Sequence, residues 1–129
     1  MTQKRTLVPR TRADGKWTEA RYWGFIRSAL RNANRRFPPR YAAKAAAKKT
    51  VTGQRHRFEF QCAECTEWFK DKEVQVDHII PAGTLRKYDD LPQFVENMFC
   101  EADGLQVLCK PCHQLKTNAE RKQRTEDSK

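Results

Sequence analysis

Hydrophobic positions in the first third of the chain follow a helical period. Between residues 17 and 37 the apolar side chains recur every three or four positions, which predicts an amphipathic helix with one buried stripe. The stripe consists of Trp23, Ile26, Leu30, Ala33 and Phe37. Pro38 and Pro39 are expected to end this helix, because the second proline disfavours helical backbone at the residue before it. Residues 1–16 show no period, and we expect them to form a mobile tail.

The next segment has helical composition without a helical pattern. Residues 42–49 read Ala-Ala-Lys-Ala-Ala-Ala-Lys-Lys, a run of high helix propensity that has no apolar stripe to bury. Two interpretations are open. The run is either a helical linker or a strip that faces nucleic acid and becomes ordered on binding.

From residue 57 onward the apolar period changes to two, as in β-strands. Phe58 and Phe60 alternate with polar residues, and with the later pair Trp68-Phe69 they predict a short hairpin. The elements predicted after it are a strand at 74–78, a polar loop at 82–93, a short helix at 91–100, a brief strand at 105–108 and a last helix at 110–124. The chain is therefore expected to be a small α+β protein.

Charge is distributed unevenly along the 129 residues, whose net charge is +10. Residues 1–57 hold sixteen Lys or Arg against two acids, or +14, whereas residues 58–129 hold ten against fourteen, or −4. We therefore predict a basic, partly helical arm at 1–57 and a separate domain at 58–129. The arm favours a polyanionic partner, with nucleic acid first and an anionic membrane surface second. The candidate nucleic-acid contacts are Arg27, Arg31, Arg35, Lys44, Lys48, Lys49 and, outside the arm, Lys116.

Four of the five cysteines form two Cys-x-x-Cys pairs separated by 43 residues: Cys62 with Cys65, and Cys109 with Cys112. Each pair offers two thiolates from one compact turn, which suits a tetrahedral structural Zn²⁺. The alternatives are disulfides, redox pairs, or a c-type haem at Cys109-Lys-Pro-Cys112-His113. No apolar signal segment and no membrane-spanning run are visible, so we expect a cytoplasmic location with reduced thiols and no membrane partner. Cys100 is left over, and we expect it to be a buried apolar residue.

Asp77 and His78 close the strand predicted at 74–78, and His113 follows the last cysteine. A carboxylate suits a hard divalent cation, and histidine is the natural general base near neutral pH. Both groups can serve one site only if the strand ends there and turns. The simpler interpretations are that His78 is an ordinary histidine at a strand end, and that His113 is a fifth candidate zinc ligand or a residue on a helix surface.

This combination of motifs resembles the HNH endonucleases, and more narrowly the small four-cysteine forms carried by tailed bacteriophages. The resemblance covers about residues 58–120. The matching segments are Cys62-x-x-Cys65, Val76-Asp77-His78-Ile79-Ile80-Pro81, and Leu105 to His113 with Lys116.

The resemblance implies a zinc-stapled, treble-clef-like ββα-metal core and cleavage of double-stranded DNA. His78 would be the general base that activates water, and Asp77 and His113 would ligate a catalytic Mg²⁺ or Mn²⁺. Products would carry a 5′-phosphate and a 3′-hydroxyl. If the chain is phage-encoded, it would act in the host cytoplasm as a homing-type nicking enzyme or in DNA packaging.

The chain departs from the family pattern at Gly104, where the family usually has an Asn that braces the loop carrying the base. Asp103 or Asn97 is a candidate replacement. This departure keeps a second class open, a non-catalytic zinc-stabilised nucleic-acid-binding protein; a zinc module that docks a protein partner is a third. Oligomeric state, monomer or homodimer, is equally open.

Overall fold

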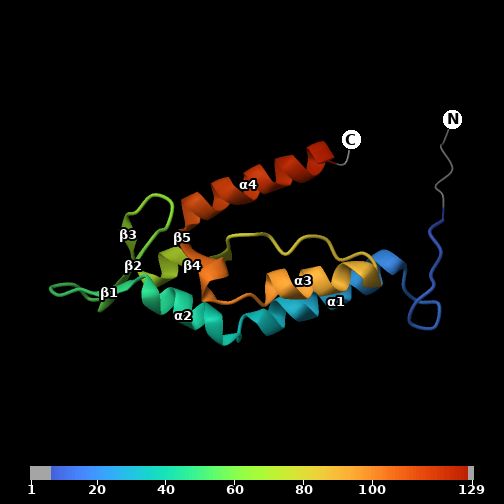
Figure 1. Cartoon of the computed structure of the whole chain (residues 1–129), viewed down its shortest axis with the longest axis horizontal. Coiled ribbons are helices and arrows are strands. Elements are labelled where there is room, and N and C mark those ends of the chain that lie inside the picture. Colours follow the sequence, from blue (N-terminus) through green and yellow to red (C-terminus); the bar gives the residue numbers. More distant parts are fainter. Residues whose placement is uncertain (1–6, 128–129) are drawn as a thin grey trace. The chain divides into compact units, whose positions relative to one another are not determined.

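The structure is a computed structural model that describes residues 7–127, and within them four helices and two antiparallel sheets form a small α+β protein (Figure 1). This finding confirms the predicted fold class at that level. The elements run in the order α1 (Glu19–Asn34), α2 (Pro38–Ala46), β1 (Lys48–Thr50), β2 (Phe58–Gln61), β3 (Trp68–Phe69), β4 (Val74–His78), α3 (Leu91–Met98), β5 (Leu105–Cys109) and α4 (Lys110–Asp127). None of the helices in this part of the chain has the length and apolar character needed to cross a bilayer.

Backbone contacts divide the chain into two compact units. Unit 1 comprises Met1–Arg36 and Ala82–Phe99, and unit 2 comprises Phe37–Pro81 and Cys100–Lys129. This division follows packing, whereas the predicted boundary between residues 57 and 58 follows charge and stays a prediction.

Unit 1 is built on α1, which begins as the sequence predicts. Thr18 is the N-cap residue, and its side-chain oxygen accepts a hydrogen bond from the N–H of Arg21 at 3.2 Å. The predicted stripe residues Trp23, Ile26 and Leu30 contribute to one apolar cluster. The other members of this cluster are Tyr22, Ala82, Leu85, Leu91, Phe94, Met98 and Phe99.

The end of α1 differs from the prediction. The helix ends at Asn34, which is buried and donates a hydrogen bond from Nδ2 to the carbonyl oxygen of Met98 at 2.8 Å. Ala33 is exposed, although the helical period predicts it in the stripe. Asn34, the next residue, is buried instead, because its side-chain amide has a hydrogen-bond partner in the interior.

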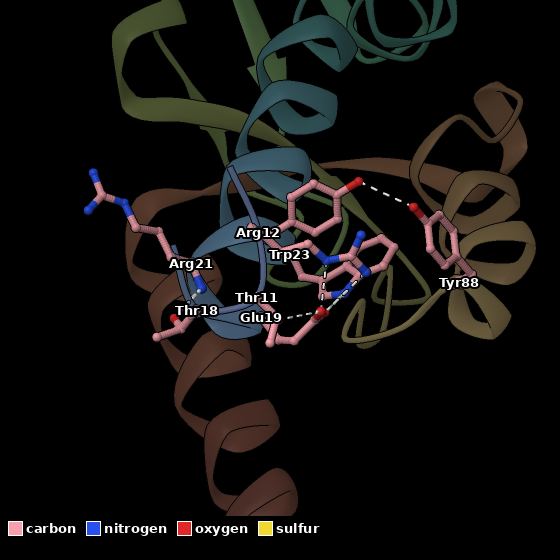
Figure 2. A network of polar contacts seen from close by, with 8 residues as sticks. Thr11, Arg12, Thr18, Glu19, Arg21, Trp23 and Tyr88 are labelled. Carbon is pink, nitrogen blue, oxygen red and sulfur yellow. Dashed lines mark hydrogen bonds and ion pairs between the residues drawn. The ribbon is translucent and has the colours of Figure 1, made fainter. Parts of the chain in front are cut away.

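A polar network attaches the segment before α1 to the helix (Figure 2). Arg12 Nε donates to Glu19 Oε1 at 2.7 Å, and Trp23 Nε1 donates to Glu19 Oε2 at 3.0 Å. The backbone of Arg12 also pairs with that of Trp17. The hydrogen bond from Arg12 holds the pKa of Glu19 below its ordinary value. The expectation of a mobile tail therefore fails for residues 12–16, while residues 1–6 lie outside the described part.

Unit 2 begins with α2, whose first residue is Pro38. Proline is tolerated in the first helical turn because its missing N–H would have no helical partner there. The two prolines thus start a helix, in addition to following one. The helix expected at residues 42–49 continues only to Ala46, because residues 48–50 form β1 and pair with β2.

Two small sheets complete unit 2. In the first, β2 lies between β1 and β3, and Phe60 is opposite both Lys48 and Phe69. This arrangement contains the predicted hairpin. In the second sheet, β4 pairs antiparallel with β5, with Val76 opposite Val107. Side chains from both sheets share one apolar cluster, which contains Phe60, Phe69, Val74, Val76, Val107 and Ala47.

Helix α4 follows β5 without a loop, and β4 lies beside β5 (Figure 1). The order β4–β5–α4 thus forms a ββα unit inside unit 2. Its two strands present one face to the shared apolar cluster, which leaves the other face available to side chains from α4.

Candidate metal and catalytic sites

The four paired cysteines converge at the junction of the two sheets in unit 2. Their sulfur atoms all lie within 4.8 Å of one another. Cys62 comes directly after β2, and the chain then turns tightly: the N–H of Thr66 donates to the carbonyl of Cys62 at 3.0 Å, and Thr66 has a positive φ of 64°. Cys109 ends β5, and Cys112 lies in the first turn of α4.

The donor set fits a structural metal ion such as Zn²⁺. Four sulfur ligands from two short turns are the composition of closed zinc sites. Although burial opposes it, backbone N–H groups of Cys109, Cys65 and Glu64 lower the pKa of Cys62 to about 6. The thiol of Cys112 has its pKa raised to about 12, through its hydrogen bond with Cys109 and burial. The first thiolate therefore forms readily, and a cation bound by it favours ionisation of the others.

The second group of interest lies on the free face of the ββα unit. Asp77 Oδ1 is 3.5 Å from His113 Nε2, and Asp77 Oδ2 is 2.8 Å from Lys116 Nζ. His113 and Lys116 are three residues apart on α4 and hence on one side of that helix. The structure thus brings together Asp77 and His113, which the resemblance assigns to one metal site. Their oxygen and imidazole nitrogen are suitable ligands for a divalent cation.

His78 is the last residue of β4 and is still paired with Leu105, so strand alternation places its side chain on the opposite face from Asp77. Its backbone carbonyl accepts a hydrogen bond from Lys116 Nζ at 2.8 Å, and its neighbour Ile79 donates its N–H to the carbonyl of Gly104 at 2.9 Å. The His78 side chain is half-buried. One lysine therefore contacts both residues of the Asp77-His78 pair.

Lys116 was a candidate phosphate contact on charge alone, and the structure gives it three partners inside the protein. They are Asp77, the carbonyl of His78, and Glu120 Oε1 at 2.6 Å. Burial lowers the pKa of Lys116, but the hydrogen bonds that its ammonium group donates to Asp77 and Glu120 outweigh this effect and raise the pKa above its ordinary value. The ammonium group thus occupies one oxygen of the Asp77 carboxylate.

Sequence reasoning missed Gln106. This residue is directly opposite Asp77 in the β4–β5 register, and its Nε2 donates to Asp77 Oδ2 at 3.4 Å. The signal was present in the two predicted strands, because pairing them antiparallel from their ends places residues 77 and 106 together. A cleft of about 410 Å³ lies beside these groups. Its lining residues are Glu64, Ile79, Gln106, Leu108, Cys112, Leu115 and Lys116.

The remaining predicted nucleic-acid contacts differ in their surroundings. Arg31 and Arg35 are exposed, whereas Arg27 is half-buried and donates to the carbonyl of Leu85 at 3.3 Å. Lys44 forms an ion pair with Asp71. Lys48 and Lys49 are exposed and each covers an aromatic ring, Phe58 at 4.4 Å and Trp68 at 4.1 Å from the ring centroid.

The position that departs from the family pattern has no room for a side chain. A Cβ atom added to Gly104 would lie 2.9 Å from Cys100 Sγ and 3.2 Å from Cys100 Cβ. Cys100 is half-buried rather than fully buried as expected. Of the two candidate replacements, Asp103 is exposed, and Asn97 Nδ2 donates to the carbonyl of Ala82 at 3.4 Å, within unit 1.

A scan against protein-family models finds no match to this chain, and searches of curated proteins and of solved structures find none either. The functional argument therefore depends on the residues and the geometry described above.

Proposed function

We propose that the chain is a metal-dependent endonuclease of the HNH kind, which hydrolyses phosphodiester bonds in DNA. The observation that carries the proposal is the 3.5 Å approach of Asp77 Oδ1 and His113 Nε2 on the free face of a ββα unit. His78 follows Asp77 in the sequence, at the end of the same strand. Along the chain, Asp77 and His78 end one strand, a second strand and a helix follow, and His113 lies on that helix. This is the order that the family resemblance requires. The four-cysteine cluster at the base of the same unit supports it.

In this proposal the residues divide the work of hydrolysis. His78 accepts a proton from a water molecule, and the resulting hydroxide attacks phosphorus in line with the departing 3′ oxygen. Asp77 and His113 would hold a divalent cation, Mg²⁺ or Mn²⁺, and such a cation would supply stabilisation of the negative charge that develops on the phosphate oxygens. The products are a 5′-phosphate and a 3′-hydroxyl.

Lys116 and Gln106 act as positioning residues. Both reach Asp77 Oδ2, and Lys116 also holds the backbone at His78. They leave Asp77 Oδ1 directed to His113, which is the oxygen that the proposed cation needs. A carboxylate fixed by two donors keeps its geometry when a cation binds.

The second candidate is a zinc-stabilised nucleic-acid-binding protein without catalysis. Gly104 favours it, because the position lacks the bracing side chain of the family and Cys100 fills the space that such a side chain needs. The two candidates share the zinc site and the basic residues, and they differ in whether His78 and a cation at Asp77 and His113 cleave the phosphodiester bond.

The deciding experiment is conversion of supercoiled plasmid to open-circle or linear DNA by zinc-loaded protein, with Mg²⁺ or Mn²⁺ added. We expect metal-dependent cleavage by the wild type and a loss of roughly 10²- to 10⁴-fold in His78→Ala, the range typical of a general base. Gln93→Ala is the control, since Gln93 is exposed on α3 in unit 1 and takes no part in the proposed site.

Zinc content and DNA affinity are measured for each variant. A wild type that is folded, zinc-loaded and DNA-bound but never cuts would establish the non-catalytic binder instead. Loss of zinc in His78→Ala would assign that residue a structural role. Full activity in His78→Ala would exclude it as the base.

A further inference from the structure

The outer face of the β1–β2–β3 sheet combines basic and aromatic side chains. We call it the basic–aromatic face and define it by Lys49, Arg57, Gln61 and Trp68. The strand register places these residues on one side: Lys49 is opposite Glu59, and Trp68 is opposite Gln61. Residues two apart on a strand share a face, so Glu59 and Gln61 join the two pairs.

The hairpin extends this face beyond the regular strands. The N–H of Val51 donates to the carbonyl of Arg57 at 2.8 Å, which continues the ladder between β1 and β2. Strand alternation then puts Arg57 on the side of Glu59 and Lys49. The inner side of the same sheet is occupied, because Phe60 and Phe69 belong to the apolar cluster of unit 2.

The aromatic ring on the outer face is accessible. Trp68 is 36% exposed, and the only ring contact it makes among the described residues is with Lys49 Nζ, 4.1 Å from its centroid. A tryptophan at a solvent-facing sheet position adds nothing to the core, so its ring is available to a partner with a flat face.

Charge on the hairpin selects the partner. Residues 47–61 contain four Lys or Arg and one acid. Lys48, Lys49, Arg55 and Arg57 are exposed and form no ion pair with any residue between 7 and 127. The one carboxylate, Glu59, lies 2.9 Å from His56 Nε2. Lys49 and Arg57 lie on the outer face with Trp68, and exposed cations without carboxylate partners beside an exposed ring complement a phosphate backbone with accessible bases.

We propose that the basic–aromatic face binds a single-stranded segment of nucleic acid, with one base stacked on Trp68 and phosphates held by Lys49 and Arg57. The inference deepens the proposed nuclease function and rests on it for the identity of the substrate. A single strand is favoured over a duplex because the faces of paired bases are already stacked and cannot reach a ring on a sheet surface.

Lys49 does not block this use of Trp68. An ammonium group over an exposed ring is a weak contact, and a stacked base makes the stronger one. When the base replaces it, the Lys49 ammonium becomes free to pair with the phosphate of the same nucleotide. The cation–π pair of the free protein thus keeps both groups near the place where a nucleotide would need them.

The face belongs to the same compact unit as Asp77, His78 and His113, and its sheet shares an apolar cluster with β4 and β5. A nucleic-acid strand bound at Trp68 is therefore held by the same compact unit that carries the proposed active site. The substrate class that follows is DNA with unpaired nucleotides beside the cut, such as a flap, a fork or a single-stranded end.

The test is fluorescence anisotropy of the full chain, zinc-loaded and without added Mg²⁺ or Mn²⁺, on a labelled single-stranded oligonucleotide and on the duplex of the same sequence. We expect Trp68→Leu to lose about tenfold in affinity for the single strand and less than about twofold for the duplex. Trp68→Phe keeps a ring and should restore most of the loss. Phe25→Leu, which removes an exposed ring from unit 1, is the matched control.

Equal losses on both substrates, or none, would overturn the inference, provided that zinc content and thermal unfolding match the wild type. Plasmid cleavage measured alongside separates the two proposals. Cleavage that persists with a Trp68→Leu variant of unchanged affinity refutes the stacking surface alone. Stacking without cleavage by the wild type refutes the nuclease alone. A parallel RNA oligonucleotide shows whether the strand must be DNA.

Discussion

Gly104 offers a direct test of packing at the start of β5. Replacing it with alanine would place a Cβ atom 2.9 Å from Cys100 Sγ and 3.2 Å from Cys100 Cβ. A contact of 2.9 Å is shorter than a methyl group and a sulfur atom tolerate, so either the side chain or the backbone must move. The φ angle of Gly104 lies outside the left-handed region, and the backbone itself therefore accepts alanine.

The expected change in stability is the difference between two effects. Overpacking costs about 1–3 kcal/mol. The smaller conformational freedom of alanine in the unfolded chain returns about 0.4–1 kcal/mol. With the middle of each range, Gly104→Ala should therefore lower the free energy of unfolding by roughly 1.3 kcal/mol, or roughly 4–8 °C in Tm for a chain of this size.

The assay is a double-mutant cycle in thermal and urea unfolding. In Cys100→Ala the 2.9 Å contact is absent while the 3.2 Å contact with Cβ remains, so we expect Gly104→Ala to lower the free energy of unfolding less there than in the wild type. Gly24→Ala is the matched control: it lies in α1, where the nearest atom would be 3.6 Å from the new Cβ, and it should stabilise the helix. A Gly104→Ala protein as stable as the wild type would show that Cys100 moves aside freely.

Two further predictions concern the metal site and Lys116. Cys109→Ser should lose bound zinc and most of the folding cooperativity of unit 2, because zinc binding of about 10–16 kcal/mol is coupled to folding in such sites. The measurements are the amount of released zinc and the thermal unfolding curve, with Cys100→Ser as the control. Unchanged stability of Cys109→Ser would exclude a structural metal. Lys116→Met should destabilise the protein by about 1–3 kcal/mol without added cations, since Asp77 keeps a partly buried charge with one donor fewer. Mg²⁺ or Mn²⁺ should then stabilise this variant more than Lys122→Met, an exposed control on the same helix.

The strands and the four-cysteine cluster were accessible from sequence because their signals are local. Val74 and Val76 alternate with polar residues, and each Cys-x-x-Cys pair is a turn of fixed size, so the strand and both thiol pairs follow from spacing. The end of α1 was less accessible. Ala33 and Asn34 both fit a helical stripe, and only the distant carbonyl of Met98 decides that the polar residue is the buried one.

Contacts that depend on pairing between distant segments could not be derived from a linear pattern. The strand character of residues 48–50 depends on β2, since lysine has no strong preference for strands and the preceding alanines favour helix. The role of Lys116 depends on the register that brings Asp77 to α4. From its charge alone Lys116 was predicted to contact phosphate, whereas its three partners in the structure show that it holds the end of β4 at Asp77 and His78.

The four cysteines and the proposed catalytic group depend on one another through shared elements. Cys109 ends β5 opposite Val74, at the start of the strand that ends in Asp77 and His78. Cys112 immediately precedes His113 on α4, so a metal held by Cys109 and Cys112 fixes the first turn of that helix. The position of His113 relative to Asp77 therefore follows from the thiol cluster, and loss of the metal should separate the two groups before it affects unit 1.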